Sequence, residues 1–195
     1  MIKLSINEQL NQQRQKLRKQ MRAKRLALSS EQQTLAAQSI IPKSLELIEQ
    51  HSAQHIAFYL PFNGEISPLA LINELTKQGK DLYLPVLHPF SANQLLFLKY
   101  QGQEQLEMNR FGILQPKLDV RNVLPLSELE IIFVPLVACD KQCNRLGMGG
   151  GFYDRTLAQA KHLISVGLAH HCQQVEQLPI ESWDEPLDYI VLGES

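Results

Sequence analysis

The chain has 195 residues, of which 44% are hydrophobic and 20% are charged, and its formal net charge is −1. This length suits one domain with a sizeable core, and the composition is ordinary for a soluble globular protein. No apolar run is long enough to span a membrane, and the amino terminus lacks the apolar core of a signal peptide. Three cysteines, an odd number, favour a reducing compartment. We therefore expect a cytoplasmic protein, and a monomer.

The charge is distributed unevenly along the chain. Residues 1–28 contain eight Lys or Arg residues and one acid, Glu8, a balance of +7 that leaves −8 for the remainder. This asymmetry argues against a uniformly basic nucleic-acid binder and indicates a local site for an anion.

Helical periodicity is clear near the amino terminus, over about residues 7–28. One stripe is apolar and consists of Leu10, Leu17, Met21 and Leu28, and an adjacent stripe is basic and consists of Arg14, Arg18, Arg22 and Arg25. The basic stripe could be a solvated face or an arm for nucleic acid. Because it borders the buried seam, its arginines could instead reach an enclosed phosphate.

Further elements follow in chain order. Ser29 and Ser30 are typical of a helix N-cap, and Pro42 should kink or restart this second helix. A third helix is expected to have Ser67 as its cap, Pro68 at its first position and Gly79 at its end. Strands are predicted at 55–60, 81–87, 95–100, from 131 onward, at 163–169 and at 189–192. We therefore expect a single α/β domain with a mixed, mostly parallel sheet flanked by helices, and a helical amino terminus packed across it.

The chain's most informative stretch runs from Ile131 to Arg155. An apolar strand and a polar turn precede four of the ten glycines, which fall within residues 147–151, and a helix is expected to begin near Phe152. A strand, a glycine loop and a helix start together form a cradle for phosphate, because backbone N–H groups can converge on an anion. Arg145 before the loop can hold phosphate, and Asp154 after it can hold a metal.

Common nucleotide motifs do not match this loop. A Walker loop would end in Gly-Lys-Ser/Thr, and the dinucleotide fingerprint would have glycine where Phe152 stands. A zinc site is also not indicated, because its possible ligands have no zinc-finger spacing; these are Cys139, Cys143, His170, His171 and Cys172.

The pattern Pro-x-x-x-x-Asp-x-x-x-x-Arg-Leu-Gly-x-Gly-x-Gly-Phe-Tyr-Asp-Arg, which begins at Pro135, closely resembles the signature of the 5-formyltetrahydrofolate cyclo-ligase family. The resemblance extends from about Arg14 to Asp188. It implies Mg²⁺- and ATP-dependent cyclisation of 5-formyltetrahydrofolate to 5,10-methenyltetrahydrofolate through an iminium phosphate, with release of ADP and phosphate. The implied partners are these small molecules and neither nucleic acid nor membrane.

The resemblance also assigns roles to residues of this chain. Arg145 and Tyr153 would be catalytic. The implied ATP site consists of Arg14, Arg18, Arg145, Leu146, Gly147, Met148, Gly149, Gly150, Gly151, Phe152 and Tyr153. The implied folate site consists of Leu60, Glu65, Met148, Gly149, Gly150, Gly151 and Phe152. Asp154 and Asp188 would contact Mg²⁺. From the sequence alone, Phe111 could line the folate pocket or pack in the core.

Two positions depart from the family pattern: Cys143 stands where the family usually has glycine, and Leu136 where it often does. Cysteine would be a poor choice for a left-handed backbone. We therefore expect Cys143 to have a negative φ, and any left-handed position in this turn to fall at Asn144.

Two other functions remain open from the residues alone. One is a sugar-phosphate isomerase or acyl-transfer enzyme, which would need a catalytic acid such as Glu65. The other is a folate or nucleotide sensor without turnover, against which the intact Arg145, glycine loop and Asp154 argue.

Overall fold

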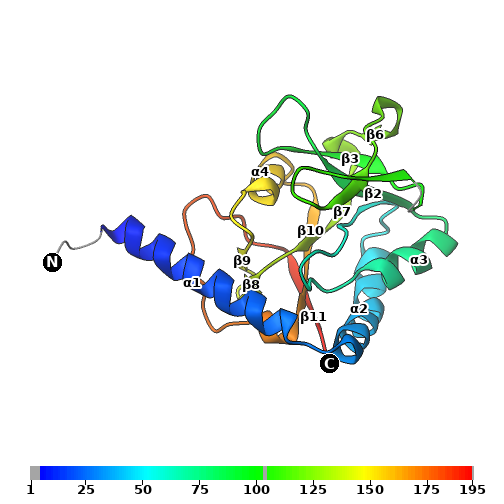
Figure 1. The fold of residues 1–195 in the computed structure, drawn as a ribbon. Helices are drawn as coiled ribbons and strands as arrows, with labels where there is room; N and C mark the ends of the chain where they lie inside the picture. Colours follow the sequence, from blue (N-terminus) through cyan, green and yellow to red (C-terminus); the bar gives the residue numbers. More distant parts are fainter. Residues whose placement is uncertain (1–4, 103–104, 195) are drawn as a thin grey trace.

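A computed structural model describes residues 5–102 and 105–194 as one α/β unit (Figure 1). The helices are α1 (Ile6–Leu26), α2 (Ser30–Gln50), α3 (Leu69–Lys77) and α4 (Phe152–Gln159), with short 3-10 turns η2 (Val120–Asn122), η3 (Leu126–Glu128) and η4 (His171–Gln173). The strands of the main sheet are β1 (His55–Ala57), β2 (Asp81–Leu87), β3 (Leu95–Lys99), β6 (Val123–Leu124), β7 (Ile131–Pro135), β10 (Ile164–His170) and β11 (Tyr189–Gly193). Two small pairs, β4 (Leu106–Met108) with β5 (Leu114–Pro116) and β8 (Ala138–Cys139) with β9 (Arg145–Leu146), lie outside it.

The main sheet has the order β11-β10-β7-β1-β2-β3-β6. The five strands from β11 to β2 are parallel, whereas β3 pairs antiparallel with β2 and the edge strand β6 pairs antiparallel with β3. The predicted mixed, mostly parallel sheet is therefore confirmed. In open sheets of this type, ligands are typically bound by the loops that follow the carboxyl ends of the parallel strands.

Two core clusters cover the two faces of this sheet. One contains buried residues of α2 and α3, such as Ile40, Leu47 and Leu71, against Phe58 and Phe133. The stacked rings of Phe58 and Phe133, whose centroids are 4.6 Å apart, tie β7 to the segment after β1. The other cluster packs α4 against the opposite face. The strands lie between these layers, which explains why they read as continuous apolar runs.

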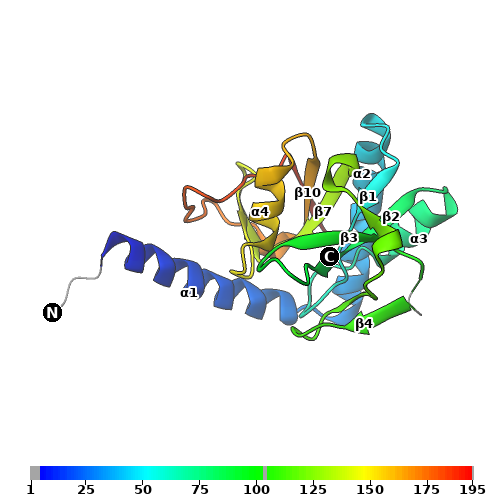
Figure 2. The same cartoon turned by 90° about the horizontal axis from the view of Figure 1, so that it is seen from above.

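Helix α1 lies apart from these layers and extends beyond the sheet (Figures 1 and 2). Its N-cap Ser5 and Glu8 form a capping box. Leu17 and Met21 from its apolar stripe pack against Val137, Leu146 and Leu178. The predicted amino-terminal helix is thus confirmed within two residues at each end, and it docks on the β8–β9 pair instead of on the main sheet.

Several local predictions are corrected. Helix α2 begins after the N-cap Ser29, as expected, but it runs through Pro42 without a restart. Ile40 and Leu47, on either side of the proline, are buried in the same core cluster, and this packing outweighs the one backbone hydrogen bond that proline cannot donate. The N-cap of α3 is Pro68 and not Ser67, so the helix begins one residue later than predicted.

Strand positions are largely as predicted, with differences at the ends. Strand β1 ends at Ala57, three residues early, although the Phe58 N–H still donates to the Tyr83 carbonyl at 2.9 Å. The sequence did not predict the pairs β4–β5 and β8–β9, whose strands of two or three residues are too short for a periodic signal. No helix in the described part of the chain combines the length and apolarity needed to cross a membrane.

Candidate active site

The glycine loop joins β9 to α4, and this helix begins at Phe152, as the sequence predicted. Gly149 has φ +101° and Gly151, the N-cap of α4, has φ +67°, values that a residue with a Cβ rarely adopts. No side chain caps α4, so the first N–H groups of the helix remain available to an anion. The centre of the loop, from Met148 to Gly150, is exposed, so a ligand can reach these amides from solvent.

Arg145 lies beneath this loop and is only 5% exposed. Its Nη2 donates to the Asp154 carboxylate in a short ion pair, and its guanidinium carbon lies 5.7 Å from the centre of the Tyr153 ring. Its Nε is buried and, among the described residues, has no hydrogen-bond partner. A buried donor without a partner costs about 1–3 kcal/mol, so this N–H is well suited to an acceptor supplied by a ligand.

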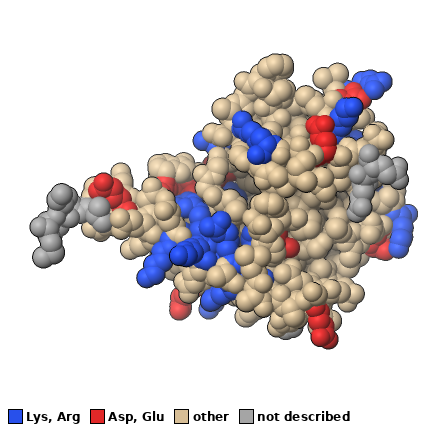
Figure 3. All heavy atoms as spheres, in the orientation of Figure 1, with Lys and Arg blue, Asp and Glu red and all other residues tan. Residues whose placement is uncertain are grey.

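Arg18 reaches the glycine loop from α1, and Arg14, one turn earlier, contacts Pro179 and Asp184. Arg18 Nε donates to the Gly147 carbonyl at 2.8 Å, which places its charge directly beside the glycine loop. Burial, together with the nearby charge of Arg14, lowers the pKa of the Arg18 guanidinium. Arg14 is more enclosed and pairs with Asp184. Basic side chains gather over α1 in Figure 3, as the charge asymmetry of the sequence predicted.

Glu65 lies in the loop after β1 and is held by two contacts. Its Oε2 accepts the Phe62 N–H at 3.1 Å, and its Oε1 lies 3.7 Å from Arg25 Nη2. Arg25 is completely buried and donates to the carbonyls of Asn63 at 2.8 Å and Leu136 at 3.2 Å. This arginine therefore ties α1 to the loops that follow β1 and β7, and it fixes the position of Glu65.

The environment of Glu65 is unfavourable to negative charge. Burial raises its pKa from 4.5 to about 7, against the opposing influence of Arg25 and the Phe62 N–H. Glu65 also lies close enough to Tyr153 to affect its titration: burial raises the pKa of the Tyr153 phenol and the Glu65 charge adds to this effect, while Arg145 opposes it. Tyr153 of α4 thus lies near both Glu65, from the loop after β1, and Arg145 of β9.

Aromatic and apolar groups border this cluster. The Phe111 and Phe152 rings meet edge to face with centroids 6.1 Å apart, which brings the β4–β5 hairpin to the start of α4. Phe111 is 49% exposed, so it does not pack in the core. Leu60 is half-buried and packs against the first core cluster. A flat ligand could be sandwiched by such groups.

The two predicted metal ligands occupy different surroundings. Asp154 lies in the first turn of α4 and pairs with Arg145. Asp188 lies just before β11, where its Oδ2 accepts the Ser165 N–H at 2.8 Å and the Ser165 hydroxyl at 2.7 Å. No hydrogen bond or ion pair of the described residues links Asp188 to Arg145, Asp154 or the glycine loop.

The donor set near the loop suits a hydrated, phosphate-bound ion better than a protein-enclosed one. Within residues 5–102 and 105–194, no group of three or more His, Cys, Asp or Glu side chains could hold a metal. Mg²⁺ commonly uses one or two carboxylates and completes its shell with water and substrate phosphates. Asp154, whose side chain is 20% exposed, fits such an ion when a polyphosphate is bound.

The turn before Arg145 overturns one prediction. Cys143 has φ +61°, whereas Asn144 is not among the positive-φ residues. The turn is fixed by the buried Asp140, whose carboxylate accepts the N–H groups of Gln142, Asn144 and Leu178 at 3.0–3.1 Å. These bonds place the left-handed backbone conformation at Cys143, although asparagine tolerates that conformation better than cysteine does. Asp140 therefore shapes this turn.

The strain at Cys143 leads to a stability prediction. Cys143→Gly should raise the free energy of unfolding by about 1 kcal/mol, because glycine adopts positive φ without the Cβ penalty. This value is a net gain: the relief of strain is partly offset by the greater entropy of the unfolded chain and by the lost packing of a half-buried thiol. Thermal unfolding should show an increase of about 2–4 °C. Cys172→Gly, at a position without positive φ, serves as the control and should not stabilise; a lower melting temperature for Cys143→Gly would show that packing of the thiol outweighs the strain.

The second departure from the family pattern is accommodated by a glycine elsewhere. Leu136 is buried, and a Cβ added to Gly167 on the neighbouring β10 would lie 2.8 Å from its Cδ2. Gly167 therefore provides the space that Leu136 occupies.

Some site residues were not singled out by sequence reasoning. Arg25 was part of the predicted basic stripe, but nothing in its spacing distinguished a buried anchor from a solvated charge. Asp184, the partner of Arg14, lies in an irregular segment with no periodicity. Tyr59 is buried with its hydroxyl donating to the Ile66 carbonyl at 2.6 Å, and the Glu65 charge contributes to raising its pKa after burial itself. Each of these contacts depends on the fold.

Comparisons with known proteins place the chain in a family. The family model described as "5-formyltetrahydrofolate cyclo-ligase family" matches residues 10–193. A Haemophilus influenzae protein named 5-formyltetrahydrofolate cyclo-ligase is 56% identical over 93% of this chain and 98% of its own length. A protein of the same name from Escherichia coli strain K12 is 51% identical over 87% of this chain and 94% of its own length.

Solved structures resemble the fold as well. A 5,10-methenyltetrahydrofolate synthetase from Aquifex aeolicus superposes with a TM-score of 0.78 at 32% identity and covers 92% of this chain and 89% of its own. One from Mycoplasma pneumoniae superposes with a TM-score of 0.73 at 25% identity and covers 91% of this chain and 96% of its own. With the glycine loop, Arg145 and Glu65 assembled in one place, the chain is an enzyme that belongs to the 5-formyltetrahydrofolate cyclo-ligase family.

Proposed function

We propose that this enzyme converts 5-formyltetrahydrofolate to 5,10-methenyltetrahydrofolate with ATP as co-substrate and Mg²⁺ as the accompanying ion, releasing ADP and phosphate. The observation that carries the nucleotide part is Arg145: a buried guanidinium beneath an exposed glycine loop, with one donor left unpartnered among the described residues. The folate part rests on family membership, on the buried Glu65, and on the aromatic contact between Phe111 and Phe152 beside that loop.

The proposed chemistry explains why such a site is needed. A formamide oxygen is a poor leaving group, so the γ-phosphoryl group is transferred to it and an iminium phosphate forms. The N10 amine of the folate then attacks the activated carbon, and phosphate leaves as the ring closes. Catalysis therefore depends on aligning the formyl oxygen with the phosphoryl group and on neutralising charge on the phosphoryl oxygens.

Different residues of this chain bind the phosphoryl group, the folate and the metal ion. Arg145 and Arg18, with the amides from Gly147 to Gly151, stabilise the transferring phosphoryl group. Glu65 and Leu60 contact the folate on the side of the β1 loop, and Tyr153 lies between the two substrates, near both Glu65 and Arg145. Asp154 would hold the Mg²⁺, which supplies further neutralisation of the phosphates. Asp188 already binds Ser165 through Oδ2, so its Oδ1 would be the oxygen that contacts this ion.

This proposal predicts a double requirement. Purified protein should form the methenyl product, followed by its absorbance, only when both ATP and Mg²⁺ are present. Excess chelator should abolish turnover, and Mg²⁺ added back should restore it. A coupled measurement of ADP release, with and without 5-formyltetrahydrofolate, shows whether hydrolysis depends on the folate. Full turnover in chelator, or ATP binding with no product under any condition, would contradict the proposal; the second result would favour the sensor.

A further inference from the structure

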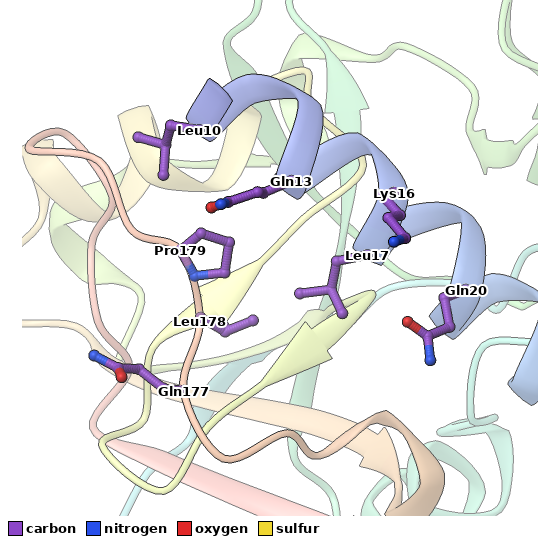
Figure 4. A pocket seen from close by; sticks show the side chains of 8 residues that line it. All are labelled: Leu10, Gln13, Lys16, Leu17, Gln20, Gln177, Leu178 and Pro179. Atoms are coloured by element: carbon purple, nitrogen blue, oxygen red, sulfur yellow. The ribbon is translucent and has the colours of Figure 1, made fainter. Parts of the chain in front are cut away.

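Segment 178–184, here called the strap, runs beside α1 outside every helix and strand of the fold. Figure 4 shows Leu178 and Pro179 of the strap facing Leu10, Gln13 and Leu17 of the helix across an open groove. The strap begins at an anchored point, because the Leu178 N–H donates to the buried Asp140 carboxylate at 3.1 Å. Its path along α1 is therefore fixed at one end by the turn that precedes Arg145.

Its other end is fixed by Arg14. The guanidinium donates through Nη1 to the Pro179 carbonyl at 2.8 Å and to Asp184 Oδ2 in a short contact, and through Nη2 to Asp184 Oδ1 at 3.0 Å. Both side chains are nearly enclosed, with exposed fractions of 8% and 9%. The Asp184 Oδ2 atom also accepts the Glu181 N–H at 2.8 Å, so the carboxylate itself is held in place.

The bidentate contact with Asp184, together with the bond to Pro179, restricts Arg14 in two ways. It fixes the plane of the guanidinium, because two parallel bonds to one carboxylate allow little rotation. It also uses both hydrogens of Nη1 and one of Nη2, which leaves one Nη2 hydrogen and the Nε hydrogen for other acceptors. Burial acts to lower the pKa of Arg14, but the bonds and charge of Asp184 more than offset it and the pKa is raised.

We propose that Asp184 is a positioning residue for the nucleotide site: it holds Arg14 in one orientation, so that the remaining N–H groups of Arg14 point to the polyphosphate of ATP. The proposal rests on ATP being the co-substrate. Asp184 itself does not touch the nucleotide, and its charge would repel phosphate if Arg14 were absent.

Asp184→Asn tests this directly, because it preserves shape and removes the charge and one acceptor. KM for ATP should rise on the order of tenfold, as for loss of an orienting partner, while kcat changes less than about threefold and KM for 5-formyltetrahydrofolate stays unchanged. Glu181→Gln is the matched control: its carboxylate lies 3.9 Å from Arg14 Nε, and KM for ATP should change less than about twofold.

A double-mutant cycle separates positioning from simple attachment of the helix. In an Arg14→Ala background, adding Asp184→Asn should leave KM for ATP unchanged or lower it, since an uncompensated carboxylate near the phosphates is removed. Loss of an attachment alone would instead raise both substrate KM values, whereas a lower melting temperature is expected in either case, because Asp184→Asn breaks a buried ion pair. If Asp184→Asn alone does not fold, the double variant, which lacks both charges, still reports the sign of the effect.

Three results would overturn the positioning role: Asp184→Asn behaving like Glu181→Gln, equal increases in both KM values, or a full additional effect in the Arg14→Ala background. The wild-type enzyme distinguishes this outcome from failure of the proposed function. If wild-type turnover does not require ATP, the proposed function is wrong; if it does and the variants behave in one of these three ways, only the role of Asp184 is wrong.

Discussion

Replacing Arg145 with alanine should lower kcat/KM by roughly 10²-fold or more, about 3 kcal/mol of transition-state stabilisation. Three observations support an effect of this size. The guanidinium is 5% exposed, so water screens its charge poorly. It is positioned by Asp154 on one side and by the Tyr153 ring on another. Its Nε has no partner among the described residues, which leaves a donor available to a ligand.

Steady-state kinetics with both substrates varied measure this loss, and thermal unfolding reports whether the variant folds. Asp154 is left without its ion pair in Arg145→Ala, but its side chain is partly exposed and can be hydrated, so the fold should survive. Arg145→Lys retains charge without the fork of donors and should recover only part of the activity. Arg121→Ala, at an exposed arginine paired with Asp119, is the control and should leave kcat/KM unchanged. A loss smaller than threefold in folded Arg145→Ala would show that Arg145 is structural.

Glu65→Gln should remove a large part of the pH dependence of stability. The folded protein holds a proton on Glu65 up to about pH 7, whereas the unfolded chain releases it near pH 4.5. Between these values the folded state binds more protons than the unfolded state, so the free energy of unfolding falls as pH rises through this window. The shift corresponds to at most about 3 kcal/mol, or roughly 6–12 °C in melting temperature for a chain of this length.

Melting temperatures of wild type and variant at pH 5 and pH 8 test this prediction. The difference, variant minus wild type, should be more positive at pH 8, because only wild type then has to ionise a buried carboxyl that burial disfavours. The exposed Glu107→Gln should melt in parallel with wild type at both pH values. If the melting temperature of Glu65→Gln also changes with pH in parallel with that of wild type, Arg25 fully compensates the Glu65 charge, and the pKa of Glu65 in the folded protein is not raised.

The sequence predicted the parts of the fold that depend on local pattern. Strand β2 was predicted at its observed bounds, and helix α1 within two residues, because each has a strong periodic or apolar signal and recognisable end residues. Pro42 shows the limit of local reasoning: proline disfavours a helix interior, yet packing on both sides keeps α2 intact. Cys143 shows the same limit in a turn, where bonds to Asp140 set the backbone.

Some parts of the candidate site could likewise be predicted from the sequence, and others could not. The glycine loop, Arg145 and Asp154 are close together in the chain, so their motif could be read directly. The surroundings of Glu65 could not, because they depend on a buried arginine from α1 and a tyrosine from α4. The sequence also gave no indication that Arg14 is enclosed by the strap. Arg14→Ala therefore removes a buried ion pair as well as the proposed nucleotide contact, and we expect it to affect stability too.

The long-range hydrogen bonds of the α1 arginines also determine when the site can form as the chain folds. Arg25 bonds to carbonyls 38 and 111 residues further along, and Arg14 bonds to a carboxylate 170 residues away. Contacts so distant along the chain close large loops and tend to form slowly. During synthesis α1 is made first, but its arginines can form these contacts only after nearly the whole chain has been synthesised. The proposed phosphate-binding side of the enzyme is therefore completed last, although two of its three arginines, Arg14 and Arg18, are synthesised first.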